Sequence, residues 1–199
     1  MFPHFFMPRV KLFDENEVLT KAMNLFWKQG YSVTSIQDLV SHLGINRASL
    51  YNTFGDKEQL FKKSFELYRK SSIEALTVFF QCRPNVKEGI LELFNIAIED
   101  AIVDKDRKGC FVVNITTELI PNDENLLKVL EINKNDIENI FYDYLLKGKE
   151  NGQLKANTDL KSIASLFFTL YCGIKVVSKV ETNKKELTNS VNLILSLLV

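Results

Sequence analysis

The sequence is poor in residues that interrupt helices and in residues that bind metals. Among 199 residues there are only four prolines, eight glycines, three cysteines and two histidines. Few prolines and glycines favour helices over a turn-rich sheet protein. The cysteines, Cys82, Cys110 and Cys172, are dispersed and lack CxxC or histidine spacing. We therefore expect no metal and no cofactor, and a reducing cytoplasm as the compartment.

The chain also lacks the signatures of an exported or membrane protein. Its start, MFPHFFMPRV, has neither a basic n-region nor an apolar run of signal-peptide length. The longest apolar stretch, residues 163–177, is too short to span a bilayer and is interrupted by Ser165, Thr169 and Lys175. No membrane partner is expected.

Net charge is absent as well, because 25 Lys and Arg balance 25 Asp and Glu. The charges are nevertheless divided unevenly. Residues 1–70 contain ten Lys and Arg against seven Asp and Glu, whereas residues 71–199 contain fifteen against eighteen. A polyanion such as DNA requires local rather than net positive charge, so the N-terminal part is the better candidate to contact it.

Residues 34–60, TSIQDLVSHLGINRASLYNTFGDKEQL, predict two short helices joined by a tight turn. Thr34 followed by Gln37 has the spacing of an N-terminal capping box. The first helix then has an apolar face at helical spacing, and Gly44 supplies the left-handed residue that ends it. That face consists of Ile36, Leu39, Val40 and Leu43.

The second short helix has the features of a DNA recognition helix. Asn46 is its N-cap, and Ile45 with Leu50 can form a hydrophobic staple that fixes the direction of entry. Its outward side chains form hydrogen bonds, which suits a helix inserted into the DNA major groove. They are Arg47, Ser49, Asn52 and Thr53. The pattern predicts a helix-turn-helix with residues 46–53 as its recognition helix.

The motif T-x-x-x-D-L-V-x-x-L-G-I-N-R-x-S-L-Y-x-T-F-G-D-K-E-x-L-F resembles the DNA-binding signature of the TetR/AcrR family of transcriptional regulators. The commonest family pattern has Ala, Ala and Ser where this chain has Val40, Leu43 and Asn46, and an aromatic residue or His in place of Thr53. These differences concern which operator is read rather than the fold.

The geometry of the motif and the resemblance together predict the DNA contacts. Arg47 is best placed for guanine O6 and N7, with Ser49 and Asn52 reaching other base edges. A lysine is unfavourable in the first turn of a helix, so a DNA phosphate beside Lys57 would explain its presence there. The predicted phosphate contacts are Thr34, Asn46, Tyr51, Thr53 and Lys57.

The whole chain is predicted to be all-α, with about nine helices in two domains. Residues 1–55 form the helix-turn-helix DNA-binding domain, and residues 56–199 form a helical effector-binding and dimerisation domain. A helix over residues 56–81 begins inside the motif and extends into the second domain. We expect this helix to be the mechanical link between them.

The first residues contain two prolines and no periodic pattern. Residues 1–8 are therefore expected to be an irregular extension, or else an aromatic cluster that packs on a neighbour. Arg9 and Lys11 follow, either as a basic arm that contacts phosphates or as solvated side chains.

Residues 109–121, GCFVVNITTELIP, place Cys110, Asn114 and Glu118 four apart on one helical face. The subset of the TetR/AcrR family that has the G-I-N-R turn often resembles this chain here as well, because its members share the pattern G-C-x-x-x-N-x-x-x-E. The face is either the polar wall of an effector pocket or part of a tightly packed helix. In the second interpretation, which we favour, Cys110 is a small hydrophobe and the amide and carboxylate bind neighbouring helix ends.

Effector-pocket candidates combine this face with the aromatic residues of the second domain, although such aromatics more often form a core. They are Phe79, Phe94, Cys110, Phe111, Asn114, Glu118, Phe141, Tyr144, Phe168 and Tyr171. The last two predicted helices are more apolar than one small core requires, which suggests a subunit interface. Its predicted residues are Ile163, Phe167, Leu170, Ile174, Val191, Ile194, Leu195 and Leu198. The resemblance implies a two-fold dimer whose last two helices pair with those of its partner.

These observations predict a homodimeric, cytoplasmic transcriptional repressor that binds double-stranded DNA at a palindromic operator and is released by a small-molecule effector. One alternative is a ligand-independent DNA-binding protein of the same fold, with an architectural or division-related role. Another is a helical enzyme that uses Cys110 and Glu118. The enzyme is disfavoured because the sequence offers no histidine partner, metal cluster or phosphate loop.

Overall fold

The computed structural model describes residues 13–120, 123–180 and 183–198, and these form nine α-helices, one short 3₁₀ turn and no strand. The predicted all-α class is confirmed. The helices are α1 (Glu15–Gln29), α2 (Ile36–Leu43), α3 (Arg47–Phe54), α4 (Lys57–Gln81), α5 (Val86–Val103), α6 (Phe111–Leu119), α7 (Glu124–Glu150), α8 (Leu160–Val177) and α9 (Lys184–Leu195). The predicted extension 1–8 and the basic arm at Arg9 and Lys11 lie outside the described residues.

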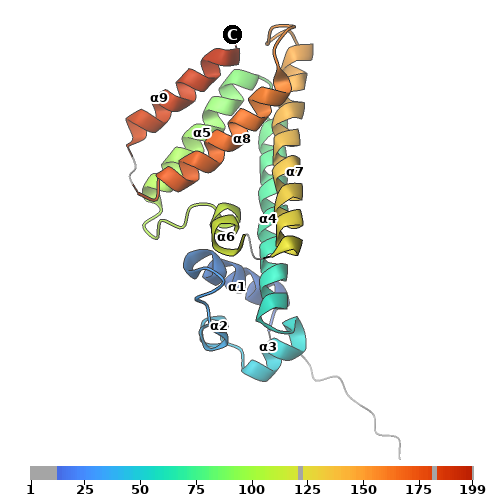
Figure 1. The fold of residues 1–199 in the computed structure, drawn as a ribbon, viewed down its shortest axis with the longest axis vertical. Coiled ribbons are helices and arrows are strands. Elements are labelled where there is room, and N and C mark those ends of the chain that lie inside the picture. Colours follow the sequence, from blue (N-terminus) through green and yellow to red (C-terminus); the bar gives the residue numbers. More distant parts are fainter. Residues whose placement is uncertain (1–12, 121–122, 181–182, 199) are drawn as a thin grey trace, which may run out of the picture.

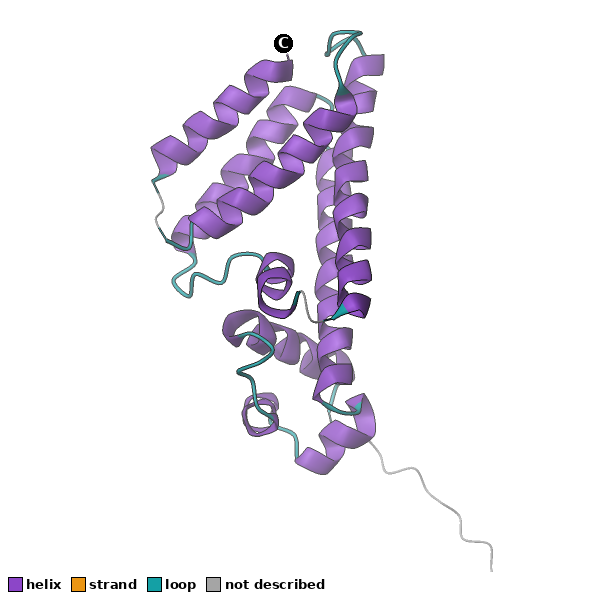
Figure 2. Cartoon of the chain, in the orientation of Figure 1, coloured by secondary structure: helices purple, strands orange, loops and turns teal. Residues whose placement is uncertain are grey.

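Figure 1 shows α1, α2 and α3 at one end of an elongated molecule and α5, α8 and α9 at the other. The long helices α4 and α7 run side by side, and α6 lies between the two ends (Figures 1 and 2). The 25-residue α4 starts next to α3 and reaches the upper helices, as the sequence predicts for the linking helix.

Two hydrophobic cores occupy the two ends, and α4 contributes to both. Phe61 and Phe65 of α4 belong to the lower core, whereas Phe80 belongs to the upper one. The lower core also contains Phe111 and Ile115 of α6, which are fully buried. The apolar packing therefore does not divide at residue 55, because α6 completes the core of the helix-turn-helix unit.

The N-cap of α2 is Ser35 rather than Thr34. The Asp38 amide donates to Ser35 Oγ (3.1 Å), and the Ser35 amide donates to Asp38 Oδ2 (2.9 Å). Thr34 is fully buried, and its hydroxyl donates to the Gly30 carbonyl (2.6 Å). The predicted Thr34–Gln37 capping box is wrong by one residue, because both pairs fit the same spacing. A buried Thr34 cannot contact a DNA phosphate, so that predicted contact is also wrong.

The helix α8 is long and apolar enough to cross a membrane by length and composition alone. In this fold it is a packing helix that contacts α5 and α7 and buries Leu160, Ile163, Phe167 and Ile174. Its opposite face carries exposed apolar side chains.

The predicted dimer-interface residues lie on the inner face of α8 and α9. Ile163, Phe167, Ile174, Val191, Leu195 and Leu198 are buried in the core of a single chain, and Leu170 and Ile194 pack against that core. The six buried side chains are not available to a partner, whereas Leu170 and Ile194 are only partly buried. The prediction therefore selected mainly the core-facing side of each helix. It did so because the strongest apolar stripe of a helix faces its own core.

Ser35→Ala is expected to lower the free energy of unfolding by about 0.5–2 kcal/mol, because it removes the acceptor for the Asp38 amide. Gln37→Ala, the capping position that the sequence pattern favoured, is the matched control and should change it by less than about 0.5 kcal/mol. Urea unfolding followed by circular dichroism measures both. Equal losses would contradict the capping assignment.

Ser35→Ala should also change how the free energy of unfolding depends on pH. Hydrogen bonds from the Ser35 side chain and backbone hold the pKa of Asp38 below its usual value. A carboxyl with a depressed folded-state pKa adds stability above its unfolded pKa, and this is lost as the pH falls through the folded pKa. Ser35→Ala should therefore reduce the loss of stability in acid.

Candidate nucleic-acid interface and ligand cavities

The recognition helix α3 is built as the sequence predicts. Asn46 Oδ1 accepts a hydrogen bond from the Ser49 amide (2.8 Å), so Asn46 is its N-cap. Leu50 and Phe54 are buried and fix the helix on the lower core. The predicted contact residues lie on the other side: Arg47, Tyr51 and Asn52 are exposed, and Ser49 and Thr53 are half-buried. This arrangement leaves a polar helix face free for a DNA groove.

Lys57, at the start of α4, has a partner inside the protein. Its ammonium lies 4.3 Å from the centroid of the Tyr31 ring, a cation–π contact that offsets the unfavourable helix dipole. Asp56 Oδ1 caps the same helix by accepting from the Gln59 amide (2.8 Å). A phosphate is thus not needed to explain why a lysine stands here, and the phosphate contact of Lys57 stays a prediction.

A cavity of about 640 Å³ lies among α1, α4, α5, α6, α7 and α8. We call it the effector cavity, after the role that is proposed for it below. Its wall is largely apolar and aromatic, with Lys134, Lys175, Asp100 and Glu131 among the charged residues that line it. Such a composition is typical of small-molecule sites, in which a few polar groups orient a mostly apolar ligand. Three of the predicted pocket residues line it, namely Cys110, Phe168 and Tyr171.

Most of the other predicted pocket residues belong to the cores. Phe94, Phe111 and Phe141 are almost completely buried there. Tyr144 is buried, and its hydroxyl donates to the carbonyls of Arg83 (2.8 Å) and Asn85 (2.9 Å). Phe79 lies beneath the Arg83 guanidinium, 3.5 Å from the ring centroid. These residues therefore do not line the described cavity, because composition alone does not separate an aromatic cavity wall from an aromatic core.

Asn114 and Glu118 hold backbone rather than line the effector cavity. Asn114 Nδ2 donates to the Lys108 carbonyl (2.7 Å), and Lys179 Nζ donates to Asn114 Oδ1 (2.6 Å). The carboxylate of Glu118 accepts from the Tyr31 amide (3.1 Å) and the Ser32 amide (2.6 Å). The packed-helix interpretation of this face is therefore correct for both polar groups, while Cys110 alone faces the cavity.

Trp27 is not among the predicted pocket residues, yet it contributes to the cavity. Its ring lines the effector cavity and lies 5.0 Å from the Tyr68 ring, and Nε1 donates to the Gly109 carbonyl (3.2 Å). A residue of the DNA-binding unit thus forms part of the cavity wall. Nothing in the α1 pattern distinguishes this position from its buried neighbours, because the contact depends on how α6 crosses α1.

Of the two thiols that line the cavity, that of Cys172 is the more deeply buried in an apolar setting. Burial, and then the nearby Cys110, raises the pKa of Cys172 to about 12, so this thiol is a poor nucleophile at neutral pH. Burial likewise raises the pKa of Tyr68, whose hydroxyl donates to Cys110 Sγ (3.8 Å). Within residues 13–120, 123–180 and 183–198, no cluster of His, Cys, Asp or Glu could hold a metal ion.

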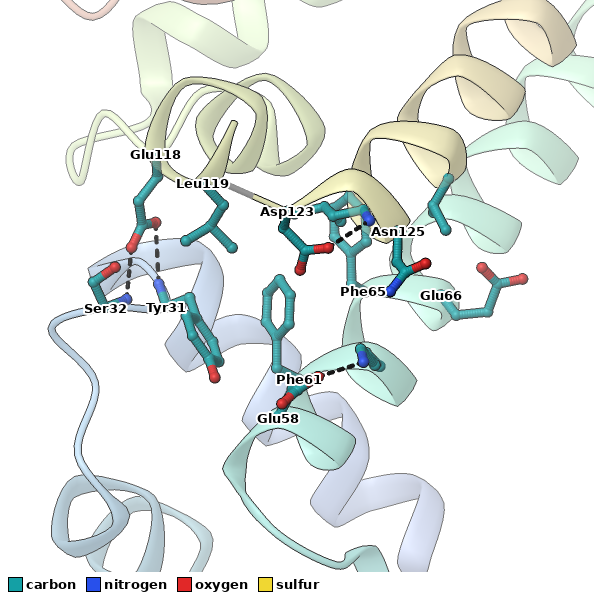
Figure 3. Close-up of a pocket in the computed structure, with 13 residues that line it drawn as sticks. Tyr31, Ser32, Glu58, Phe61, Phe65, Glu66, Glu118, Leu119, Asp123 and Asn125 are labelled. Carbon is teal, nitrogen blue, oxygen red and sulfur yellow. Dashed lines mark hydrogen bonds and ion pairs between the residues drawn. The ribbon is translucent and has the colours of Figure 1, made fainter. Parts of the chain in front are cut away.

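A second cavity of about 580 Å³ lies where the helix-turn-helix unit meets α4, α6 and α7 (Figure 3). We call it the junction cavity. Its carboxylates are already engaged: Glu58 pairs with Lys62, and Asp123 caps α7 by accepting from an amide of that helix. Glu118 reaches across it toward the α1–α2 loop. The cavity therefore marks the joint between the two ends of the molecule.

The fold and the site define a class of protein. A three-helix unit with an exposed polar recognition helix is joined by α4 to a larger helical part that encloses an apolar cavity, which is the organisation of a helix-turn-helix regulator. The chain belongs to the tetR family of bacterial regulatory proteins. The model of that family matches residues 18–63, and the model of the tetracyclin repressor-like C-terminal domain matches residues 90–194.

Named relatives of the chain are also helix-turn-helix regulators. The HTH-type transcriptional regulator YezE of Bacillus subtilis (strain 168) is 34% identical over 194 residues, which cover 96% of this chain and all of the relative. The HTH-type transcriptional repressor ComR of Escherichia coli (strain K12) is 28% identical, covering 86% of this chain and 82% of its own. Among solved structures, a cysteine mutant of the TetR family regulator CifR in complex with a 26-bp operator DNA has a TM-score of 0.83 at 26% identity, covering 95% of this chain and 98% of that one.

The effector cavity can be tested with Trp27, the only tryptophan of the chain. In a Cys82→Ser/Cys172→Ser background, a thiol-reactive nitroxide on Cys110 is expected to quench Trp27 fluorescence strongly, because both side chains line the same cavity. The same label on the exposed Cys82, with Cys110 and Cys172 replaced by Ser, should leave the emission nearly unchanged. Comparable quenching from both sites would contradict the described cavity.

Proposed function

We propose that this protein is a cytoplasmic, dimeric repressor that reads a palindromic operator with α3. The observation that carries this is the outer face of α3, where Arg47 and Asn52 are exposed on a helix held by a capped N-terminus and two buried anchors. Arg47 binds a guanine edge, Asn52 and Ser49 bind neighbouring base edges, and Tyr51, Thr53, Asn46 and Lys57 contact phosphates.

The effector cavity is the proposed site at which a small molecule relieves repression. Supporting this, the cavity is mostly apolar, has few polar groups, and touches both the DNA-binding unit at Trp27 and the upper helices at Phe168 and Tyr171. A ligand changes operator affinity only through its different affinity for the DNA-bound and released conformations. A ligand-independent regulator would instead be expected to fill this space with side chains.

Dimerisation is proposed to use the outer faces of α8 and α9. Exposed apolar residues lie there: Leu166, Val176 and Val177 on α8, Leu193 on α9, and Leu197 in the 3₁₀ turn that follows α9. A Cβ added at Gly173 on the same helix would meet no heavy atom, so that side of α8 is open for a close helix approach. Burying this surface would remove an apolar patch from water.

Arg47→Ala is expected to weaken specific operator binding by about 1–3 kcal/mol, roughly ten- to hundred-fold, because a bidentate base contact is lost. Gel-shift titration against an operator selected from random sequences measures the change. Arg107→Ala, which removes the same charge from the loop between α5 and α6, is the matched control and should bind normally. Unchanged affinity of Arg47→Ala would reject α3 as the reading helix.

The Lys57→Ala variant distinguishes a phosphate contact from a contact to a base. It should weaken specific and non-specific DNA alike and reduce the salt dependence of binding by about one counterion, because a phosphate contact carries no sequence information. A loss confined to the specific site would reassign Lys57 to base recognition.

Leu193→Glu is expected to convert the dimer into a monomer and to abolish operator binding, because the side chain is 72% exposed in one chain and would become a buried, unpaired charge in the interface. Light scattering after size exclusion measures the mass. Ile132→Glu places the same charge at an exposed apolar position of α7 and should remain dimeric. A dimeric Leu193→Glu would exclude this face.

A further inference from the structure

The helix α6 separates the effector cavity from the DNA-binding unit. Val112, Val113, Thr116 and Thr117 of α6 line the effector cavity. Glu118, near its last turn, points the other way and reaches the loop between α1 and α2 (Figure 3). One nine-residue helix thus touches both the space for a ligand and the segment that leads into the helix-turn-helix.

The contact of Glu118 with this loop is specific in its geometry. Both carboxylate oxygens are used, one by the Tyr31 amide and the other by the Ser32 amide. Such charge-assisted bonds are stronger than those between neutral groups. Gly30 has φ +90°, and a Cβ at this position would lie 2.9 Å from Glu118 Oε2. The loop therefore has the conformation and the free space that the carboxylate requires.

The loop transmits its position to α2 over a few residues. The hydroxyl of Thr34 is buried and bonded to the Gly30 carbonyl, and Ser35 directly afterwards caps α2. Tyr31 and Ser32 lie between these fixed points. A displacement of the two amides held by Glu118 must therefore move the start of α2 or break a buried hydrogen bond.

We propose that Glu118 is the positioning residue through which the effector cavity controls the helix-turn-helix. This rests on the proposed function for the identity of the cavity. In the ligand-free protein the carboxylate holds the α1–α2 loop, and with it α2 and α3, in one orientation. A ligand that displaces α6 withdraws Glu118 and frees the loop. This route is direct and acts in addition to movement of α4.

A second attachment makes α6 suited to this role. Trp27 Nε1 donates to the Gly109 carbonyl immediately before α6, while Glu118 holds the loop near the other end of the helix. Lys28 adds an ion pair with Asp106 (2.9 Å) on the same side as Trp27. Because α6 is attached to α1 at its start, a tilt of the helix moves its far end, where Glu118 lies, by the largest amount.

The first experiment measures amide hydrogen exchange by NMR on the full chain without DNA. In Glu118→Ala the Tyr31 and Ser32 amides should exchange about tenfold faster or more, because their acceptor is gone, while amides in α1 and α6 keep their rates. Glu118→Gln should rescue part of the protection, since its oxygen accepts one of the two bonds. Glu124→Gln, an exposed carboxylate of α7, is the control that should change nothing.

The second experiment fills the effector cavity with a defined probe. In a Cys82→Ser/Cys172→Ser background, alkyl methanethiosulfonates of increasing length are attached to Cys110, which lines the cavity. Exchange at Tyr31 and Ser32 should rise with probe size when Glu118 is present. In Glu118→Ala the same probes should produce no further rise, because the connection is already absent.

Two outcomes would overturn the proposal: unchanged exchange at Tyr31 and Ser32 in Glu118→Ala, or an equal response to the probes with and without Glu118. Both readouts are taken without DNA, so they stand apart from the test of operator binding. Protein that passes these tests but binds no operator would reject the proposed function while leaving the connection between cavity and loop intact.

Discussion

The structure depends on one aromatic contact, the packing of α6 against the start of α4. The rings of Phe61 and Phe65 meet Phe111 edge-on, with centroids 6.3 and 5.4 Å apart, in the core that also anchors the recognition helix. Burial of three such rings contributes several kcal/mol, roughly 1.5–3 each, and cannot be lost in part without opening a void. Any displacement of α6 therefore acts on the core that anchors the recognition helix.

Hydrogen bonds fix the relative orientation of α1 and α6, which apolar packing alone does not. Non-directional packing holds α1 and α6 together, but it does not fix how they are rotated about each other. The bonds from Trp27 to Gly109 and from the loop amides to Glu118 do so, because a hydrogen bond weakens steeply when its geometry changes. Such a joint has few intermediate positions, which is the property required of a two-state regulator.

The helices, the recognition helix and its caps were predictable because each is encoded locally. Asn46 and Asp56 act as caps, Leu50 and Phe54 are anchors, and Gly44 adopts φ 66° as the pattern requires. The lining of the cavity was not, because it depends on which side of a helix meets which neighbour. Phe94 and Phe168 are both aromatic residues on upper helices, yet only Phe168 faces the cavity. For the same reason the helical pattern selected Leu195 for the predicted subunit interface, although Leu195 is buried. It did not select Leu193, which is exposed.

The length of α4 sets how far a small tilt of this helix displaces its far end. With 25 residues at about 1.5 Å each, the helix is about 37 Å long, and it is anchored in a core at either end. A tilt of about 5° at one end shifts the other by about 3 Å, close to the roughly 3.4 Å step between stacked bases. In the proposed dimer such a shift would put one recognition helix a base pair out of phase with its partner. In the proposed mechanism, a lever of this length would convert a small displacement at the cavity into a change of register on the DNA.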